Sequence, residues 1–196
     1  MKKTIILLFL IGYGIVPVFA QSQIWKIDPV HSSVRFSVKH MLITEVVGQF
    51  KEYDATLTTS KADFSDAKLE ATINIQSIDT DNEKRDAHLN SEDFFYSEKY
   101  PKISFKSNSV EQIDEKTFRI KGDLTIRGIT KTVVFETSYG GTITDPYGNS
   151  RSGWQASTTV NRFDFGLKWN QVMETGGLLV GEEIKINIDA QFILQE

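Results

Sequence analysis

The stretch Ile184–Phe192, IKINIDAQF, alternates strictly between apolar and polar side chains. A period of two is typical of a β-strand with one buried face, because successive side chains point to opposite sides of a strand. The same pattern runs through residues 34–38, 69–75 and 118–126, and in weaker form through 103–105, 133–139 and 154–160. Turn-forming residues separate these segments. The sequence therefore predicts a chain built mainly of half-buried strands.

Helical signals are confined to one segment, near residues 80–98. Thr80 and Glu83 have the spacing of a capping box, and the stretch Glu83–Leu89 contains good helix formers. Ser91 is predicted to cap a second short turn through residues 94–95. One such segment cannot cover the apolar faces of about eight strands.

The strand faces must therefore meet one another, in a sandwich or in a closed antiparallel barrel. Glycines at positions 48, 122 and 140–141 lie in or beside the predicted strands. Glycine permits the sharp bends that a small barrel requires. The expected fold class is all-β: an extended antiparallel β-barrel of about eight strands with one short helical segment.

Residues 1–20 have the layout of a secretory signal peptide. Lys2 and Lys3 precede an apolar run from Ile5 to Val16, and Val18-Phe19-Ala20 offers small residues at the positions that a signal peptidase reads. The run is shorter than the ~20 apolar residues of a membrane-spanning helix, which argues against an anchor. We predict cleavage after Ala20, one domain over residues 21–196, and a periplasmic location.

The composition argues against several classes of function. The net charge is −4, and there is no basic run, so nucleic acid is a poor candidate partner. The chain contains no cysteine, which excludes disulfides, thiolate metal sites and cysteine nucleophiles. An exported protein without disulfides must be stabilised by its core alone.

A series of short motifs resembles the YceI-like, polyisoprenoid-binding proteins. They occur in the family's order: WKIDPVHS at 25–32, FSVKHM at 36–41, GQF at 48–50, RDAHL at 85–89, DFF at 93–95, YPKISF at 100–105, GDLTIRGITK at 122–131, NRFDFG at 161–166 and VG at 180–181. The resemblance covers residues 25 to about 194. It implies a lipocalin-like barrel with a helical segment near one end, and an elongated cavity for an isoprenoid or another long-chain lipid. Family members are often exported and often dimeric, so a homodimer is also an expectation.

The pattern of apolar residues alone leaves two interiors open: a dry core of interdigitated side chains, or a cavity that holds one ligand. The resemblance favours the cavity. The residues expected to line it are Phe36, Val38, Ile73, Ile75, Phe105, Phe118, Ile120, Leu124, Trp154, Ile186 and Ile188. No cofactor is expected.

The polar residues do not form a recognisable catalytic or metal-binding motif. Asp28, His31 and Ser32 lie within five residues of extended chain, where they cannot converge on one reacting atom as a triad does. Asp28 and His31 are expected to bond backbone groups instead. The histidines, which include His40 and His88, lack zinc-ligand spacing. We expect no catalytic residues and no metal site.

Five polar residues are candidates for contact with a lipid head group: Arg85, Asp86, His88, Asn161 and Arg162. The competing interpretation is a structural clamp, in which Asp86 pairs with Arg162 or caps a turn. Met173 and residues 178–180, around Gly176-Gly177, form either a mobile flap or an ordinary loop on the barrel rim.

The leading hypothesis is a non-enzymatic periplasmic protein that carries or sequesters a long apolar lipid. Two alternatives remain: an enzyme acting on a lipid-like substrate in the same barrel, and a solid-core barrel that binds a partner through its outer surface.

Overall fold

The computed structural model describes residues 22–171 and 178–195. The predicted leader lies outside these residues, as do Met173 and Gly176-Gly177 of the predicted flap. The strands are β1 (Gln23–Ile27), β2 (Ser33–His40), β3 (Thr44–Phe50), β4 (Tyr53–Thr59), β5 (Lys68–Asn74), β6 (Ile78–Asp79), β7 (Lys102–Gln112), β8 (Thr117–Ile126), β9 (Ile129–Thr144), β10 (Ser150–Asn161) and β11 (Val180–Leu194). The helices are α1 (Glu83–Asn90) and the 3₁₀ turns η1 (Pro29–His31), η2 (Ile75–Ser77) and η3 (Arg162–Phe165).

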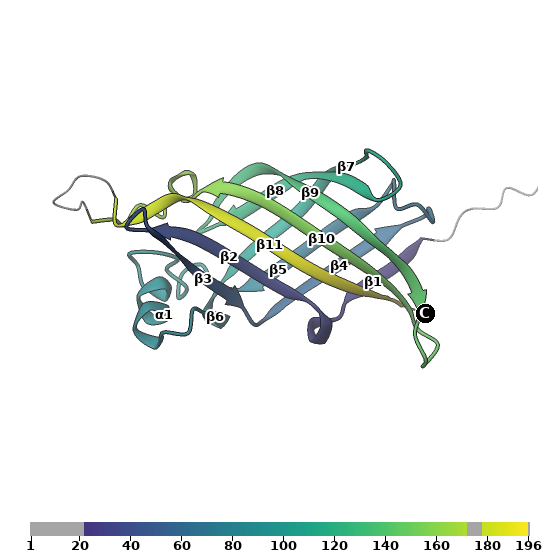
Figure 1. The fold of residues 1–196 in the computed structure, drawn as a ribbon, viewed down its shortest axis with the longest axis horizontal. Coiled ribbons are helices and arrows are strands. Elements are labelled where there is room, and N and C mark those ends of the chain that lie inside the picture. Colours follow the sequence, from purple (N-terminus) through teal and green to yellow (C-terminus); the bar gives the residue numbers. More distant parts are fainter. Residues whose placement is uncertain (1–21, 172–177, 196) are drawn as a thin grey trace, which may run out of the picture.

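The strands close into one antiparallel barrel. Hydrogen bonding follows the order β1-β4-β5-β7-β8-β9-β10-β11, and β11 pairs back onto β1. The short strands β2, β3 and β6 continue β1, β4 and β5, since β11 pairs with β2, β2 with β3, and β3 with β6. The result is an elongated barrel of eight long strands, three of them interrupted, with α1 at one end (Figure 1). The predicted extended barrel with a single helical segment is confirmed.

Two of the interruptions are formed by polar side chains that bond the backbone locally. Asp28 accepts a hydrogen bond from the Val30 backbone N–H at the start of η1, where Pro29 also lacks a donor for the sheet. Asn74 accepts one from the Gln76 N–H at the start of η2. Such local bonds compete with strand pairing, so the chain bends at these points and the barrel can close.

The inward faces of the strands form the core, as the period of two predicts. In β8, Phe118, Ile120, Leu124 and Ile126 are all buried. One apolar cluster, which includes Phe50, Phe105 and Phe165, occupies the α1 half of the barrel. A second, which includes Trp25, Phe64, Phe118 and Trp154, occupies the other half.

The helix lies where the sequence predicts it, but the predicted capping box is wrong. Asn82 is the N-cap, and its side chain accepts a hydrogen bond from the Arg85 N–H. Thr80 is instead buried beside the barrel, where its hydroxyl bonds Asp86. The second short turn is present, since the Phe94 N–H donates to the Ser91 carbonyl. The Ser91 hydroxyl, however, donates back to the His88 carbonyl at the end of α1.

Within residues 22–171 and 178–195, no helix has both the length and the apolar character needed to cross a membrane.

Candidate functional site: an apolar cavity along the barrel

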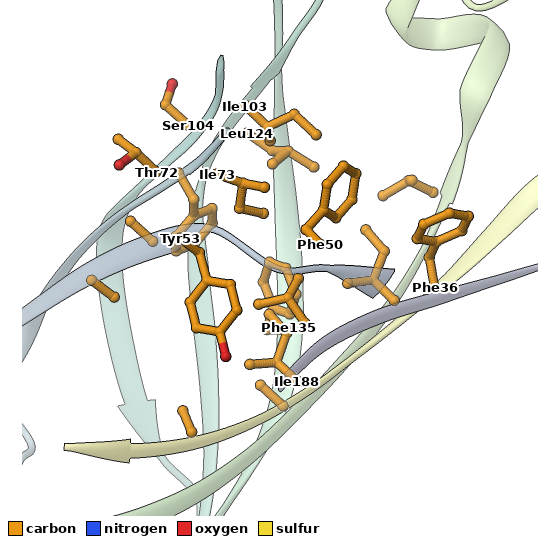
Figure 2. Close-up of a pocket in the computed structure, with 18 of the residues that line it drawn as sticks. Phe36, Phe50, Tyr53, Thr72, Ile73, Ile103, Ser104, Leu124, Phe135 and Ile188 are labelled. Carbon is orange, nitrogen blue, oxygen red and sulfur yellow. The ribbon is translucent and has the colours of Figure 1, made fainter. Parts of the chain in front are cut away.

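The barrel encloses a cavity of about 230 Å³. Inward-facing residues of both apolar clusters line it, together with Leu89, Phe94 and Phe95 from the helical segment. Figure 2 shows Phe36, Phe50, Ile73, Phe135 and Ile188, which come from five different strands, around a common space. A single water needs only roughly 10–15 Å³, so the cavity is large compared with a packing defect.

The structure places ten of the eleven predicted lining residues on the wall of this cavity. These are Phe36, Val38, Ile73, Phe105, Phe118, Ile120, Leu124, Trp154, Ile186 and Ile188. Ile75 is not on the wall. Because Asn74 ends β5 by capping η2, the alternation of β5 stops one residue early, and Ile75 lies fully buried in the core.

Three polar residues on the wall, Tyr53, Thr137 and Arg162, direct their polar groups to the protein backbone. The Tyr53 hydroxyl donates to the Ser32 carbonyl at 2.6 Å, and burial together with the charge of Asp28 raises the pKa of Tyr53. The Thr137 hydroxyl lies 3.4 Å from the Phe135 carbonyl. Arg162 is 3% exposed and bonds only backbone carbonyls among the described residues. The surface that the wall exposes to an occupant is almost wholly hydrocarbon.

Arg162 holds together three segments at the α1 end. Its guanidinium donates to the carbonyls of Leu167, Trp169, Val180 and Gly181. It also stacks on Phe163 with its central carbon 4.5 Å from the ring centroid. Burial lowers the pKa of Arg162, and the charge of Glu182 opposes this shift. The chain from η3 to β11 is thereby tied to the barrel wall.

Two clamp arrangements were open for Asp86: a pair with Arg162, or the capping of a turn. The structure shows the second, and the predicted pair with Arg162 is wrong. The Asp86 carboxylate accepts hydrogen bonds from the Thr80 N–H at 3.0 Å and the Thr80 hydroxyl at 2.5 Å. Arg85 bonds the same residue, through its Nε to the hydroxyl and through Nη2 to the carbonyl. Asp86 and Arg85 therefore fix α1 to the preceding chain, because Thr80 lies within reach of both.

His88 and Asn161 also bond protein groups. His88 Nε2 lies 3.1 Å from the Asp93 carboxylate, and its ring packs edge-on against Phe94 and Trp169. Asn161 caps η3 by accepting from the Phe163 N–H, and its amide donates to Glu182.

One clamp that the sequence analysis missed is Arg127, which donates to the Phe94 carbonyl from the β8–β9 turn. Its only sequence signal is an arginine before the turn glycine Gly128.

Asp28 lies at the break between β1 and β2, in the half of the barrel away from α1, and belongs to a polar cluster. His31 bonds its carboxylate at 2.8 Å and Arg151 at 2.6 Å, and Arg151 also bonds Asp145 at 2.5 Å. The bonds from His31, Arg151 and Val30 lower the pKa of Asp28 against the effect of burial. Arg151, above all, holds the pKa of Asp145 far below its ordinary value.

The hydroxyl of Ser32 accepts a hydrogen bond from the Gln191 N–H. Asp28, His31 and Ser32 thus brace the corner at η1 and show no triad geometry. Asp28 bonds a backbone N–H as expected, whereas the His31 ring bonds the Asp28 carboxylate rather than a backbone group. Nor do the described residues include any group of three or more His, Cys, Asp or Glu side chains placed to hold a metal ion.

Phe64 is the residue of the cavity wall that sequence reasoning missed most clearly. It belongs to the polar loop DFSD between β4 and β5, yet it is only 3% exposed. Its ring lies 5.1 Å from Trp154, 5.5 Å from Tyr139 and 5.6 Å from Trp25, measured between centroids. The available signal was a large aromatic residue in an otherwise polar turn.

Comparison with known proteins agrees with this architecture. The YceI-like domain model matches residues 25–192. UPF0312 protein SA2479 of Staphylococcus aureus (strain N315) is 38% identical over 170 residues, which cover 86% of this chain and 96% of the relative.

Among solved structures, that of the Campylobacter jejuni YceI protein has a TM-score of 0.70 and 31% identity, and covers 81% of this chain and 90% of that one. A polyisoprenoid binding domain from Saccharophagus degradans shares the fold at 12% identity, with a TM-score of 0.64 and coverage of 87% and 98%. The matches extend over nearly the whole barrel, and the chain belongs to the YceI-like family.

Proposed function

We propose that this barrel binds a long apolar lipid in its interior and carries or sequesters it without catalysing a reaction. The observation that supports this most directly is the character of the cavity. Water in a cavity needs two to four polar partners, and this wall offers almost none, so an apolar occupant is favoured. The family relation, and a neighbour of the same fold described as a polyisoprenoid binding domain, point the same way.

Chain burial is expected to dominate the affinity. Each CH₂ group removed from water contributes ~0.8 kcal/mol, part of which is lost in ordering the flexible chain. Arg85, Asp86, His88, Asn161 and Arg162 are proposed to brace the α1 end rather than to act on a head group, because the protein already satisfies most of their bonds.

The sharpest test fills the cavity deliberately. Ile73, Ile120 and Ile186 line the cavity on three different strands, whereas Ile75 is fully buried away from the wall. Replacing one wall residue by Trp should place the indole in space that the lipid would occupy. We expect at least one of the three variants to melt near the wild-type temperature when lipid-free, and to lose its capacity for a long isoprenoid alcohol such as geranylgeraniol.

Ile75→Trp is the matched control. Overpacking a filled core costs about 1–3 kcal/mol or more, so this variant should melt well below the wild type. The melting temperature and the lipid capacity must both be measured on delipidated protein, because bound lipid itself raises the melting temperature. If the three wall variants unfold as readily as Ile75→Trp, the interior behaves as a solid core, and the surface-interaction alternative is favoured. Mass spectrometry of an organic extract of the native protein would identify the natural ligand.

We also propose a periplasmic location, on the strength of the leader-like residues 1–20. The exported protein should have an intact mass that begins at Gln21; a species retaining Met1 would contradict this. The homodimer stays a prediction of the family resemblance.

A further inference from the structure

The loop between β4 and β5, residues 60–67, lies at the end of the barrel away from α1. The register places it beside the beginning of β1, because Thr59 pairs with Gln23. In Figure 1 this end carries β1 and the C-terminus, whereas α1 lies at the other end. The cavity reaches this loop, since Phe64 and Ala67 both form part of its wall.

Phe64 projects from this loop into the barrel. Trp154 lies edge-on to its ring and is itself a wall residue. Trp25 and Tyr139 also pack against Phe64, but neither is part of the wall. The ring thus lies between the cavity and two aromatic residues of this end, Trp25 and Tyr139.

The loop holds Phe64 in an unfavourable backbone conformation. Its φ is +59°, in the left-handed region that a bulky residue rarely adopts. The Asp66 carboxylate maintains the loop by accepting hydrogen bonds from the Thr59 hydroxyl at 2.5 Å and from the backbone N–H groups of Ser60 and Lys61. A conformation with this cost persists where the surrounding structure enforces it, and its effect here is to direct a phenyl ring inward.

We infer that Phe64 ends the cavity and so sets the length of the apolar chain that the barrel accommodates. The inference rests on the proposed lipid-binding function and adds to it a residue that determines specificity. A chain that has reached the ring can gain no further burial, so methylenes beyond that length add nothing to the affinity.

The test is a chain-length series with the even-numbered saturated fatty acids from octanoate to stearate. Each methylene that enters the cavity should tighten binding by up to about fourfold, until the affinity stops rising at a break length. In Phe64→Ala the break should move to longer chains by at least one member of the series. In Phe64→Trp it should move to shorter chains. Tryptophan fluorescence gives the titration, because Trp154 contacts Phe64 and lines the cavity.

Ile75→Ala is the matched control, since it removes buried volume without touching the wall, and its break should match that of the wild type. If Phe64→Ala does not fold, Phe64→Gly removes the same ring and suits the left-handed backbone. An unchanged break in a folded ring-less variant would overturn the inference while leaving lipid binding intact. If the variant takes up fatty acids faster but its break length is unchanged, Phe64 lies at the entrance of the cavity, and the inference is also overturned. A wild type with no dependence on chain length would contradict the proposed function itself, and the inference with it.

Discussion

At the scale of single residues, several charged groups near the cavity bond the backbone. Arg162 is the clearest case, because one buried guanidinium satisfies four carbonyls at the start of β11 and in the segment after η3. A guanidinium suits this task, since its five donors diverge in a fixed plane. Its position on the wall of a lipid cavity therefore does not by itself make it a head-group ligand.

Arg162→Met should lower the free energy of unfolding by about 2–4 kcal/mol, because buried carbonyls lose their donors. The folded variant should still bind geranylgeraniol, with a weakening of no more than about tenfold to a hundredfold. Urea denaturation and lipid titration measure the two effects. Arg119→Met is the control: Arg119 pairs with Glu111 and Glu136 on the exposed outer face, so its loss should change stability little. Complete loss of lipid binding in Arg162→Met with normal stability would instead indicate direct contact.

At the scale of secondary-structure elements, aromatic rings cover glycines on neighbouring strands. Phe105 on β7 lies over Gly122 on β8, and Phe36 on β2 lies over Gly48 on β3. A Cβ atom at Gly122 would come within 2.5 Å of both the Phe105 ring and the Lys106 carbonyl. The glycine thus lets an inward aromatic side chain lie close against the strand, which packs the wall without filling the lumen.

Gly122→Ala should destabilise the barrel by about 1–3 kcal/mol, because the ring and a backbone carbonyl must both move. Gly153→Ala is a matched control on β10, where a Cβ atom would meet nothing within 4 Å. That variant should be neutral or slightly stabilising, by up to roughly 0.5–1 kcal/mol. Thermal denaturation gives the melting temperatures of the two variants. Equal melting temperatures would contradict the packing argument.

At the scale of the whole molecule, β11 closes the barrel by pairing with β10 on one side and with both β1 and β2 on the other. The corner between β1 and β2 is secured by Asp28, whose partner Arg151 also binds Asp145 in the β9–β10 turn. The loop between β4 and β5 is maintained by Asp66. Closure in the half of the barrel away from α1 therefore depends on ionised carboxylates.

Stability should fall as the pH is lowered from about 4 towards 2. The folded-state pKa values of Asp28, Asp66 and Asp145 are all lowered, mainly by bonds from His31, Thr59 and Arg151 respectively. In this range the unfolded chain binds more protons than the folded one, so protonation favours unfolding. Urea midpoints over a pH series measure how steeply the stability falls with pH. This pH dependence should be weaker in Asp145→Asn than in the wild type. An equal pH dependence would show that the Asp145 carboxylate contributes little to it.

Much of the architecture follows from the sequence alone. The alternation in stretches such as Ile184–Phe192 determines which side chains face inward, because the two faces of a strand are set by backbone geometry whatever its partners. The same reasoning predicts seven of the strands, and ten of the eleven side chains that it placed on the inward face line the cavity. Helix formers and capping signals predict the single helical segment.

Only the tertiary structure decided the rest, because those features depend on groups distant in sequence. Asp86 and Arg162 have suitable chemistry for a pair, yet closure of the barrel gives each of them other partners. Phe64 reads as part of a polar turn until the left-handed loop directs it inward. Whether an apolar interior is hollow depends on how widely the closed sheet holds its walls apart, and alternation along one strand carries no information about that distance.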